Sequence, residues 1–212
     1  MALKEHDFIE LDYTGALKET KDVFDTTDAA VAKEHHLRND AKFGAVTICL
    51  GKGYLLKGLE TKLIGKETGK HHIELSPDDA FGRKNAKLIV LVPTQNFLKQ
   101  GVQPQPGLPV NIDGTNGIIR TVTGGRTIVD FNHPLAGKEV IYDVAVHKVV
   151  TDTQTKVASI VKVLLGVPAA VTVTKDDAAI ALKDELPKDA ADALSKEIIA
   201  TCGVKRVTFL KS

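Results

Sequence analysis

Side chains that could do covalent or metal chemistry are few and scattered in this sequence. The two cysteines, Cys49 and Cys202, do not form a CxxC pair, so neither a disulfide framework nor a zinc site is predicted. His71 and His72 lie in a predicted strand, where neighbouring side chains point to opposite faces and cannot easily share a metal. The pair His35–His36 lies in a polar stretch and is expected to face solvent. We therefore expect no metal and no cofactor.

Aromatic residues offer a different chemistry, that of an apolar cavity. Six of the ten aromatic residues fall in residues 1–85: Phe8, Tyr13, Phe24, Phe43, Tyr54 and Phe81. Asp25 directly follows Phe24, so one side chain could point into a cavity while the other lies at its rim. Two plainer alternatives stay open. Buried aromatic side chains most often serve packing, and the run Asp25–Asp28 also suits a turn or a helix cap.

Composition narrows the class of protein. The 212 residues are 43% hydrophobic and 26% charged, which is enough apolar material for a folded core and excludes a mainly disordered chain. Lys+Arg (28) nearly balances Asp+Glu (27), which argues against a nucleic-acid partner. Apolar runs are too short for a membrane span, and the charged start does not resemble a signal peptide. We expect a cytoplasmic, multi-domain protein with no membrane partner.

The elements that must position these residues fall into three segments. Residues 1–85 are mostly strands, the first predicted by the alternation over Phe8–Tyr13, and the spacing of Leu56, Leu59 and Leu63 predicts a short helix at 55–63. The segment 86–133, called the insert, carries only six charges and many turn residues, and predicts a small all-β unit with one helical turn at 95–100. A long strand at 138–150 resembles the first segment, so the insert interrupts one domain. Residues 151–212, called the tail, hold ten alanines and predict the order α-β-β-α-β.

Several motifs resemble one family, the FKBP-type peptidyl-prolyl isomerases. The matching stretches are Tyr13–Gly15, Val23–Thr27, Gly51–Glu60 and Ser76–Gly82. Asn132–Lys138 and Ile141–Val146 resemble the return strand of the SlyD-like branch, which carries an insert-in-flap domain at this place in the chain. By element order, the tail resembles the extra C-terminal domain of long archaeal members.

The resemblance implies an α+β fold in which an antiparallel FKBP-like sheet wraps on a short helix, with an inserted all-β domain and a C-terminal α/β domain. The implied boundaries are 1–85 with 134–150, then 86–133, then 151–212. Some positions depart from the family. Leu59 stands where Trp is frequent, Phe81 where Tyr is frequent, and Tyr142 where Phe is frequent. The histidine-rich metal-binding extension of some SlyD proteins is missing from this sequence.

Prolyl isomerisation suits such residues because it forms no covalent bond. The barrier of about 18–20 kcal/mol comes from amide resonance, and a dry apolar cavity favours the twisted amide over the more polar planar one. The resemblance places Asp25 beside the substrate amide and a backbone N–H near Leu56 on the substrate carbonyl. The implied catalytic set is Tyr13, Phe24, Asp25, Leu55, Leu56, Leu59, Phe81 and Tyr142.

A second predicted activity belongs to the insert, which is too small to bury all its apolar side chains. Exposed apolar residues would bind unfolded chains, by strand addition or by apolar contact, unless that face packs on the FKBP body. The predicted substrate-binding residues are Leu91, Phe97, Leu98 and Val102, with His133 and Leu135 at the pocket's edge.

The implied partners are unfolded or partly folded proteins, proline-containing peptides and macrolide-type FKBP inhibitors. A chaperone that holds clients with weak or no isomerase activity stays open as the alternative, and an isomerase assay on a short Xaa-Pro peptide separates the two. The tail holds none of the pocket motifs, so we expect it to supply no catalytic group. Its core is marginal in size, so it could form a homodimer.

Overall fold

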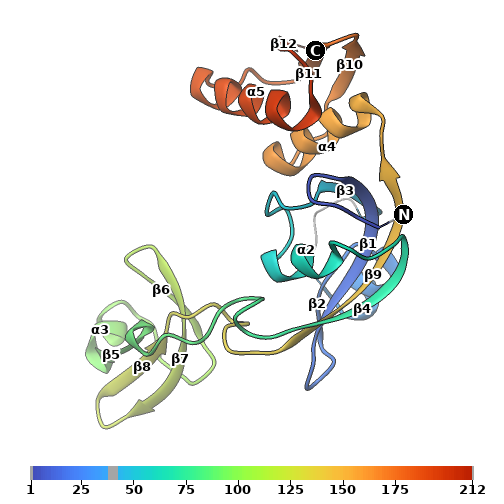
Figure 1. The fold of residues 1–212 in the computed structure, drawn as a ribbon. Helices are drawn as coiled ribbons and strands as arrows, with labels where there is room; N and C mark the ends of the chain where they lie inside the picture. Colours follow the sequence, from blue (N-terminus) through green and yellow to red (C-terminus); the bar gives the residue numbers. More distant parts are fainter. Residues whose placement is uncertain (1, 38–42, 212) are drawn as a thin grey trace. The chain divides into compact units, whose positions relative to one another are not determined.

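The computed structural model describes residues 2–37 and 43–211 and divides the chain into two compact units (Figure 1). One unit combines the residues up to Leu75 with those from Glu139 on, and the other is Ser76–Lys138. The predicted α+β class is confirmed, with an antiparallel sheet, an inserted all-β sheet and a C-terminal α/β region. The tail groups with the first unit, and the exact domain boundaries drawn from the sequence stay predictions.

Sheet A forms the core of the first unit, and all its strand pairs are antiparallel. Its order is β2-β1-β9-β4, and β3 also pairs with β1. The strands are β1 (Phe8–Leu17), β2 (Val23–Thr26), β3 (Val46–Cys49), β4 (Gly69–Leu75) and β9 (Val140–Val150). The alternating pattern predicted a strand at the start of β1, and Ile9 and Leu11 are fully buried there.

Two short helices accompany sheet A. Helix α2 (Lys57–Leu63) contacts β4 and buries Leu59 and Leu63, as the leucine spacing predicted. Helix α1 (Ala29–Glu34) follows β2 and was not predicted. Its N-cap is Asp28, whose carboxylate accepts hydrogen bonds from two backbone N–H groups of the first turn. The turn chemistry seen in the sequence therefore belongs to Asp28, which leaves Asp25 inside β2.

The register of β1 aligns residues of three strands in rows. Near its start, Phe8 lies opposite Cys49 of β3 and Val150 of β9. Near its end, Gly15 lies opposite Asp25 of β2 and Tyr142 of β9. Residues directly opposite each other in antiparallel strands are close neighbours on one face of the sheet. Each row therefore gathers residues that are far apart in the sequence.

The insert forms sheet B, with the order β5-β8-β7-β6 (Figure 1). Its elements are η1 (Ala86–Leu88), β5 (Ile89–Pro93), α3 (Thr94–Lys99), β6 (Pro109–Ile112), β7 (Thr115–Thr123) and β8 (Arg126–Asp130). The buried core of this sheet is small and consists of Phe97, Ile119 and Val129. Strand β5 lies at one edge and pairs only with β8.

The tail forms sheet C, with the order β10-β11-β12, and two helices that pack on each other (Figure 1). Its elements follow the predicted order: α4 (Thr153–Leu165), β10 (Ala170–Thr174), β11 (Asp177–Leu182), α5 (Lys188–Cys202) and β12 (Arg206–Lys211). The buried core of the tail continues into sheet A through Phe8, Cys49 and Val150. The tail therefore packs against one end of sheet A.

No helix in the described residues is long and apolar enough to cross a membrane.

Candidate functional site

Three aromatic rings from three strands meet at the Gly15 end of sheet A. Tyr142 of β9 is 3% exposed and lies between the other two. Its ring centroid is 5.9 Å from that of Tyr13 at an interplanar angle of 56°, and 5.9 Å from that of Phe24 at 81°. Tilted and edge-to-face contacts of this kind are the favoured geometry of aromatic pairs. We call Tyr13, Phe24 and Tyr142 the ring cluster.

Gly15 makes the close packing of the ring cluster possible. A Cβ atom at this position would lie 2.8 Å from Cε1 of Tyr142 and 3.0 Å from Cζ of Phe24. Both distances are well inside van der Waals contact, so any larger residue would push the rings apart. Tyr13-Thr-Gly15 was noticed in the sequence only as a motif, and the steric role of its glycine depends on two partners in other strands.

A β-bulge brings both Phe24 and Asp25 to the ring cluster. The β1–β2 register places Asp25 opposite Gly15 and Val23 opposite Ala16, so Phe24 is the extra residue between them. The ring of Phe24 contacts Tyr142, while the carboxylate of Asp25 accepts a hydrogen bond of 3.1 Å from the Tyr13 hydroxyl. The strict alternation that would send one of the two side chains to the rim does not hold at a bulge.

The hydroxyl groups of the ring cluster are held in their neutral form. Burial raises the pKa of Tyr13, and the negative charge of Asp25 raises it further. Burial likewise raises the pKa of Tyr142, with smaller contributions from Asp25 and Tyr13. Tyr13 therefore keeps its proton at neutral pH and acts as the donor to Asp25. The ring cluster is apolar, with one hydrogen-bonded carboxylate beside it.

Helix α2 and the loop before it carry the three predicted leucines. Leu59 is 1% exposed, whereas Leu55 and Leu56 are half-buried. Leu56 is the N-cap residue of α2, and its carbonyl accepts hydrogen bonds from the N–H groups of Leu59 and Glu60. Within the described residues, the N–H of Leu56 has no hydrogen-bond partner. It is therefore available to an added carbonyl group.

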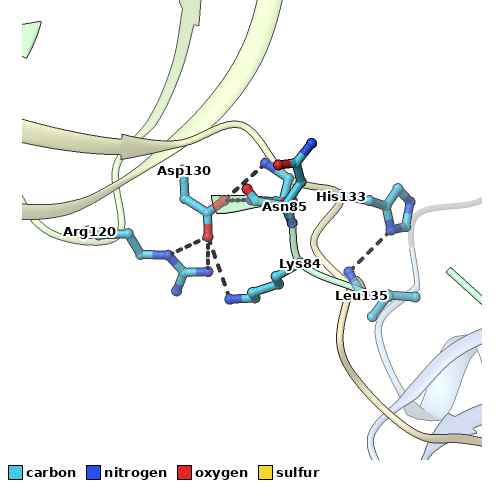
Figure 2. A network of polar contacts seen from close by, with 7 residues as sticks. Lys84, Asn85, Arg120, Asp130, His133 and Leu135 are labelled. Atoms are coloured by element: carbon cyan, nitrogen blue, oxygen red, sulfur yellow. Dashed lines mark hydrogen bonds and ion pairs between the residues drawn. The ribbon is translucent and has the colours of Figure 1, made fainter. Parts of the chain in front are cut away.

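Phe81 and His133 lie in the second unit, where their rings stack in parallel. The ring centroids are 4.8 Å apart, with an interplanar angle of 3°. The Nδ1 atom of His133 accepts a hydrogen bond of 3.2 Å from the backbone N–H of Leu135, as Figure 2 shows. His133 therefore braces this loop, one of the two roles that its sequence context left open.

Asp130 joins the chain segments that enter and leave the insert (Figure 2). It is 3% exposed and accepts hydrogen bonds from the Arg120 guanidinium at 2.8 and 3.0 Å and from Asn132 at 2.8 and 2.9 Å. Asn132 in turn bonds the backbone N–H and carbonyl of Asn85. Burial alone would raise the pKa of Asp130, but the hydrogen bonds from Asn132 and Arg120 outweigh it and hold the pKa well below its usual range.

The predicted apolar binding residues of the insert divide into two groups. Leu91 and Leu98 are exposed, at 53% and 51%. Phe97 is 5% exposed and forms the core of the insert, and Val102 packs partly buried against that core. Phe97 therefore does not lie on the surface, because the small sheet needs this large ring for its core, against which Phe131 also packs. The exposed apolar surface instead includes three residues that the sequence did not single out: Leu88, Ile89 and Val90.

A cleft of about 840 Å³ opens across β1, β9 and β4, away from most of the predicted site. Of the predicted cavity residues it includes only Tyr13, and the ionisable side chains of Asp12, His72 and Asp143 are among those that line it. His72 and Asp143 form an exposed pair at 2.7 Å. In the part of the chain that the structure describes, no group of three or more His, Cys, Asp and Glu side chains could hold a metal ion.

Known proteins match the insert and, over longer stretches, up to 69% of the chain. Residues 90–135 match the family model described as the FKBP26 IF domain. The "Short-type peptidyl-prolyl cis-trans isomerase" of Methanocaldococcus jannaschii is 30% identical over 149 residues, which cover 69% of this chain and 94% of that protein. The "FKBP-type 16 kDa peptidyl-prolyl cis-trans isomerase" of Escherichia coli (strain K12) is 40% identical over 103 residues, or 46% of this chain and 68% of that protein.

A third relative also has a long match. The "FKBP-type peptidyl-prolyl cis-trans isomerase SlyD" of Treponema pallidum is 31% identical over 152 residues, which cover 63% of this chain and 82% of that protein. The family model of the IF domain begins within β5 and ends shortly after β8, so it falls on sheet B.

Proposed function

This chain belongs to the FKBP-type peptidyl-prolyl cis-trans isomerases, in the SlyD-like branch with an insert-in-flap domain, and we propose that it isomerises Xaa-Pro bonds at the ring cluster. The observation that carries the site is the meeting of Tyr13, Phe24 and Tyr142 beside Asp25. Leu55, Leu56 and Leu59 complete the proposed cavity, whereas the role of Phe81, which lies in the second unit, stays a prediction from the resemblance.

The chemistry needs surroundings of this kind. A planar prolyl amide has a larger charge separation than the twisted amide, so leaving water costs the planar form more. Neutral rings cannot replace the water that solvates the planar amide, which lowers the barrier to rotation. No nucleophile is required, because only rotation about the C–N bond takes place.

Two polar groups would orient the substrate. Asp25 is fixed by the Tyr13 hydroxyl, so its carboxylate stays beside the rings instead of turning to solvent. The N–H of Leu56 would donate a hydrogen bond to a carbonyl of the bound peptide. Together they would hold the peptide so that its proline ring enters the apolar part of the cavity.

Substitution of Asp25 and Tyr142 tests this site. Asp25→Ala should lower kcat/KM for a short Xaa-Pro peptide about tenfold or more, and Tyr142→Ala should also weaken peptide binding, because each removes one wall or one orienting group. Asp22→Ala is the matched control, since Asp22 is an exposed carboxylate just before β2. Wild-type activity in the Asp25→Ala/Tyr142→Ala double variant would contradict the assignment.

We also propose that the insert binds unfolded chains, and the edge of sheet B supports this proposal. Four consecutive apolar residues, Leu88–Leu91, are 40–53% exposed at and just before β5. An exposed apolar edge strand is a template for pairing with another extended chain. The insert would thus add a strand of the client to sheet B.

The register identifies which backbone groups would receive that strand. Phe131 donates its N–H to the carbonyl of Leu88, and bonded pairs alternate in an antiparallel ladder. The bonded positions of β5 are therefore 88, 90 and 92, and the N–H groups of Ile89 and Leu91 point away from β8. The N–H of Ile89 already bonds the carbonyl of Ala86, so Leu91 supplies the outward donor for an added strand. Pro93 has no N–H, so it limits the edge at that end.

Two substitutions at one position separate strand addition from apolar contact. Leu91→Pro removes an outward N–H without breaking the β5–β8 ladder, whereas Leu91→Thr keeps the N–H and loses the apolar side chain. If strand addition dominates, Leu91→Pro should weaken binding of an unfolded protein about tenfold and Leu91→Thr much less. If apolar contact dominates, the two variants should lose affinity equally. Unchanged binding in both would contradict a client site on β5.

Removal of the insert tests how the two activities combine. A variant with residues 86–133 replaced by a short turn should keep tetrapeptide activity and lose most of its activity on unfolded protein. The reason is that a client bound to the insert is presented to the pocket of the same chain at high effective concentration. Equal rates of client refolding with and without the insert would contradict the proposal that the insert presents clients to the pocket.

Compartment and assembly complete the proposal. Both cysteines are free thiols, which suits a reducing compartment, and we place the protein in the cytoplasm.

We further propose that the tail forms a homodimer, because Val163, Leu164 and Val167 are 38–48% exposed at the end of α4. Light scattering tests this. A monomeric mass at micromolar concentration would contradict the dimer.

A further inference from the structure

The loop between β3 and α2 leads directly into the pocket, and neighbouring residues in it are held from two different sides. We call residues 51–55 the pocket loop. At positions 51, 53 and 55 the backbone N–H groups bond to the carboxylate of Glu60. At positions 52 and 54 the side chains contact the tail. Leu55 is the last residue of this loop and Leu56 follows it, so whatever fixes the loop also fixes these two leucines.

Glu60 supports the loop from the side of helix α2. Its carboxylate is nearly fully buried, with the residue 3% exposed, and it accepts hydrogen bonds from Gly51 at 2.8 Å, Gly53 at 3.1 Å and Leu55 at 2.8 Å. The backbone at Gly51 and Gly53 has φ values of +84° and +73°, which glycine adopts without strain. This support lies within the FKBP part of the chain.

Helix α5 of the tail supports the loop from the other side. Lys52 Nζ lies 3.0 Å from Glu197 Oε1, and the two side chains are only 26% and 33% exposed. The hydrogen bond from Lys52 is the main cause that lowers the pKa of Glu197, so the Glu197 carboxylate is ionised at neutral pH. A partly buried pair of this kind is screened less by salt than a fully exposed one.

Tyr54 adds an apolar contact to this ion pair. Its ring packs against the buried core that the tail shares with sheet A, whose tail members include Ile160, Leu194 and Ile198. Its hydroxyl is buried and has no hydrogen-bond partner within the described residues. A buried hydroxyl without a partner is unfavourable, so the contacts of the ring, and not the polar group, hold Tyr54 in this place.

We propose that the tail is a positioning element for the isomerase pocket. Glu197 acts through Lys52, and the tail core acts through Tyr54, to fix the pocket loop and with it Leu55 and the N–H of Leu56. The proposal rests on the proposed cavity. It also revises the expectation that the tail is without influence on catalysis: the tail supplies no group to the substrate, but it holds the segment that does.

Full-length variants of the ion pair test the proposal. Glu197→Gln and Lys52→Met should each raise KM for a tetrapeptide about threefold to tenfold with little change in kcat, because a looser loop binds peptide less well but leaves the ring cluster intact. The exchanged pair Lys52→Glu/Glu197→Lys should restore most of the affinity. The control is Asp176→Asn, which removes a different ion pair of the tail, Lys205–Asp176 at 2.6 Å, and should leave KM unchanged.

Hydrogen exchange provides a measurement that does not depend on activity. The amides of Gly53 and Leu55 should exchange about threefold to tenfold faster in Glu197→Gln than in wild type or Asp176→Asn. Tyr54→Phe should behave as wild type, because it keeps the ring and removes only the unpaired hydroxyl. Unchanged exchange rates of these amides in Glu197→Gln would contradict the proposal that the tail fixes the pocket loop.

The two measurements together distinguish this proposal from the proposed site. Faster exchange with an unchanged KM would overturn the link from loop to pocket. If Asp25→Ala proved as active as wild type, the proposed site would fail, yet the exchange rates would still decide whether the tail fixes the loop. A rise in KM that Asp176→Asn matched would reflect general loss of stability and would also overturn the proposal.

Discussion

At each end of strand β1, one residue lies opposite a residue in each of the two neighbouring strands, but the two rows differ in the size of their central residue. At one end Phe8 lies beside Cys49 and Val150, and the row is fully covered by the tail core. At the other end Gly15 lies beside Asp25 and Tyr142, where a side chain is missing from the middle of the row. The central residue of the first row is a large aromatic ring, whereas the central residue of the second row is a glycine.

This difference separates the end of β1 that anchors the tail from the end that carries the proposed binding site. The Phe8 ring fills its end of the sheet, and the Lys156 ammonium lies 5.4 Å from its centroid, so a helix of the tail is anchored there. The missing side chain at Gly15 lets two rings approach from the neighbouring strands and leaves an aromatic surface. Changes at the Phe8 end should therefore act on stability, and changes at the Gly15 end on activity.

The largest effect is expected at the Phe8 end of β1, where the tail packs against sheet A. Phe8→Ala should destabilise the protein by about 3–5 kcal/mol, because it leaves a cavity between sheet A and the tail. Urea unfolding measures the loss, and hydrogen exchange should show the change in α4. Phe97→Ala is the control: its ring is buried in the insert, so it should unfold sheet B while α4 keeps its protection. A loss below about 1 kcal/mol for Phe8→Ala would show that the tail is held elsewhere.

A smaller effect, of a different kind, is expected at the other end of β1. Gly15→Ala should cost about 1–3 kcal/mol and lower kcat/KM for a tetrapeptide about tenfold, because the new Cβ displaces the rings of Tyr142 and Phe24. Gly117→Ala creates an equally close contact in the insert, 2.8 Å from the Phe131 and Val129 side chains. It should destabilise sheet B and leave tetrapeptide activity intact. Equal activity in both variants would remove the functional contrast between the two ends.

Local patterns predicted most of the elements. Alternation predicted β1, leucine spacing predicted α2, and glycines at the expected places end α4 and α5 with φ values of 70° and 73°. The order of elements in the tail was correct, and the motif-based family resemblance was confirmed by the relatives. Each of these features depends on residues that are close together in the sequence or on motifs that form one continuous stretch of it.

Features that depend on distant partners were missed. Nothing near Gly15 indicates that Tyr142 will lie opposite it, and nothing near Glu60 indicates that three backbone N–H groups will converge on its carboxylate. Phe97 was expected to be exposed, but a sheet with few large side chains needs this ring for its buried core. Helix α1 was missed because six residues carry too little periodicity to predict a helix.

The smallest expected effect concerns a single hydroxyl at the Gly15 end. Tyr13→Phe keeps the ring contact with Tyr142 and removes the 3.1 Å hydrogen bond to Asp25. Asp25 is only partly buried, so water can replace the lost donor, and stability should fall by only about 0.5–1.5 kcal/mol. Activity should fall about twofold to fivefold, because the carboxylate is less firmly placed beside the substrate. Tyr54→Phe is the matched control: its buried hydroxyl has no partner among the described residues, so its loss should leave activity unchanged and should not lower stability. If the two variants behaved alike in a tetrapeptide assay, the hydrogen bond would not position Asp25, and the ring cluster would work through its apolar surface alone.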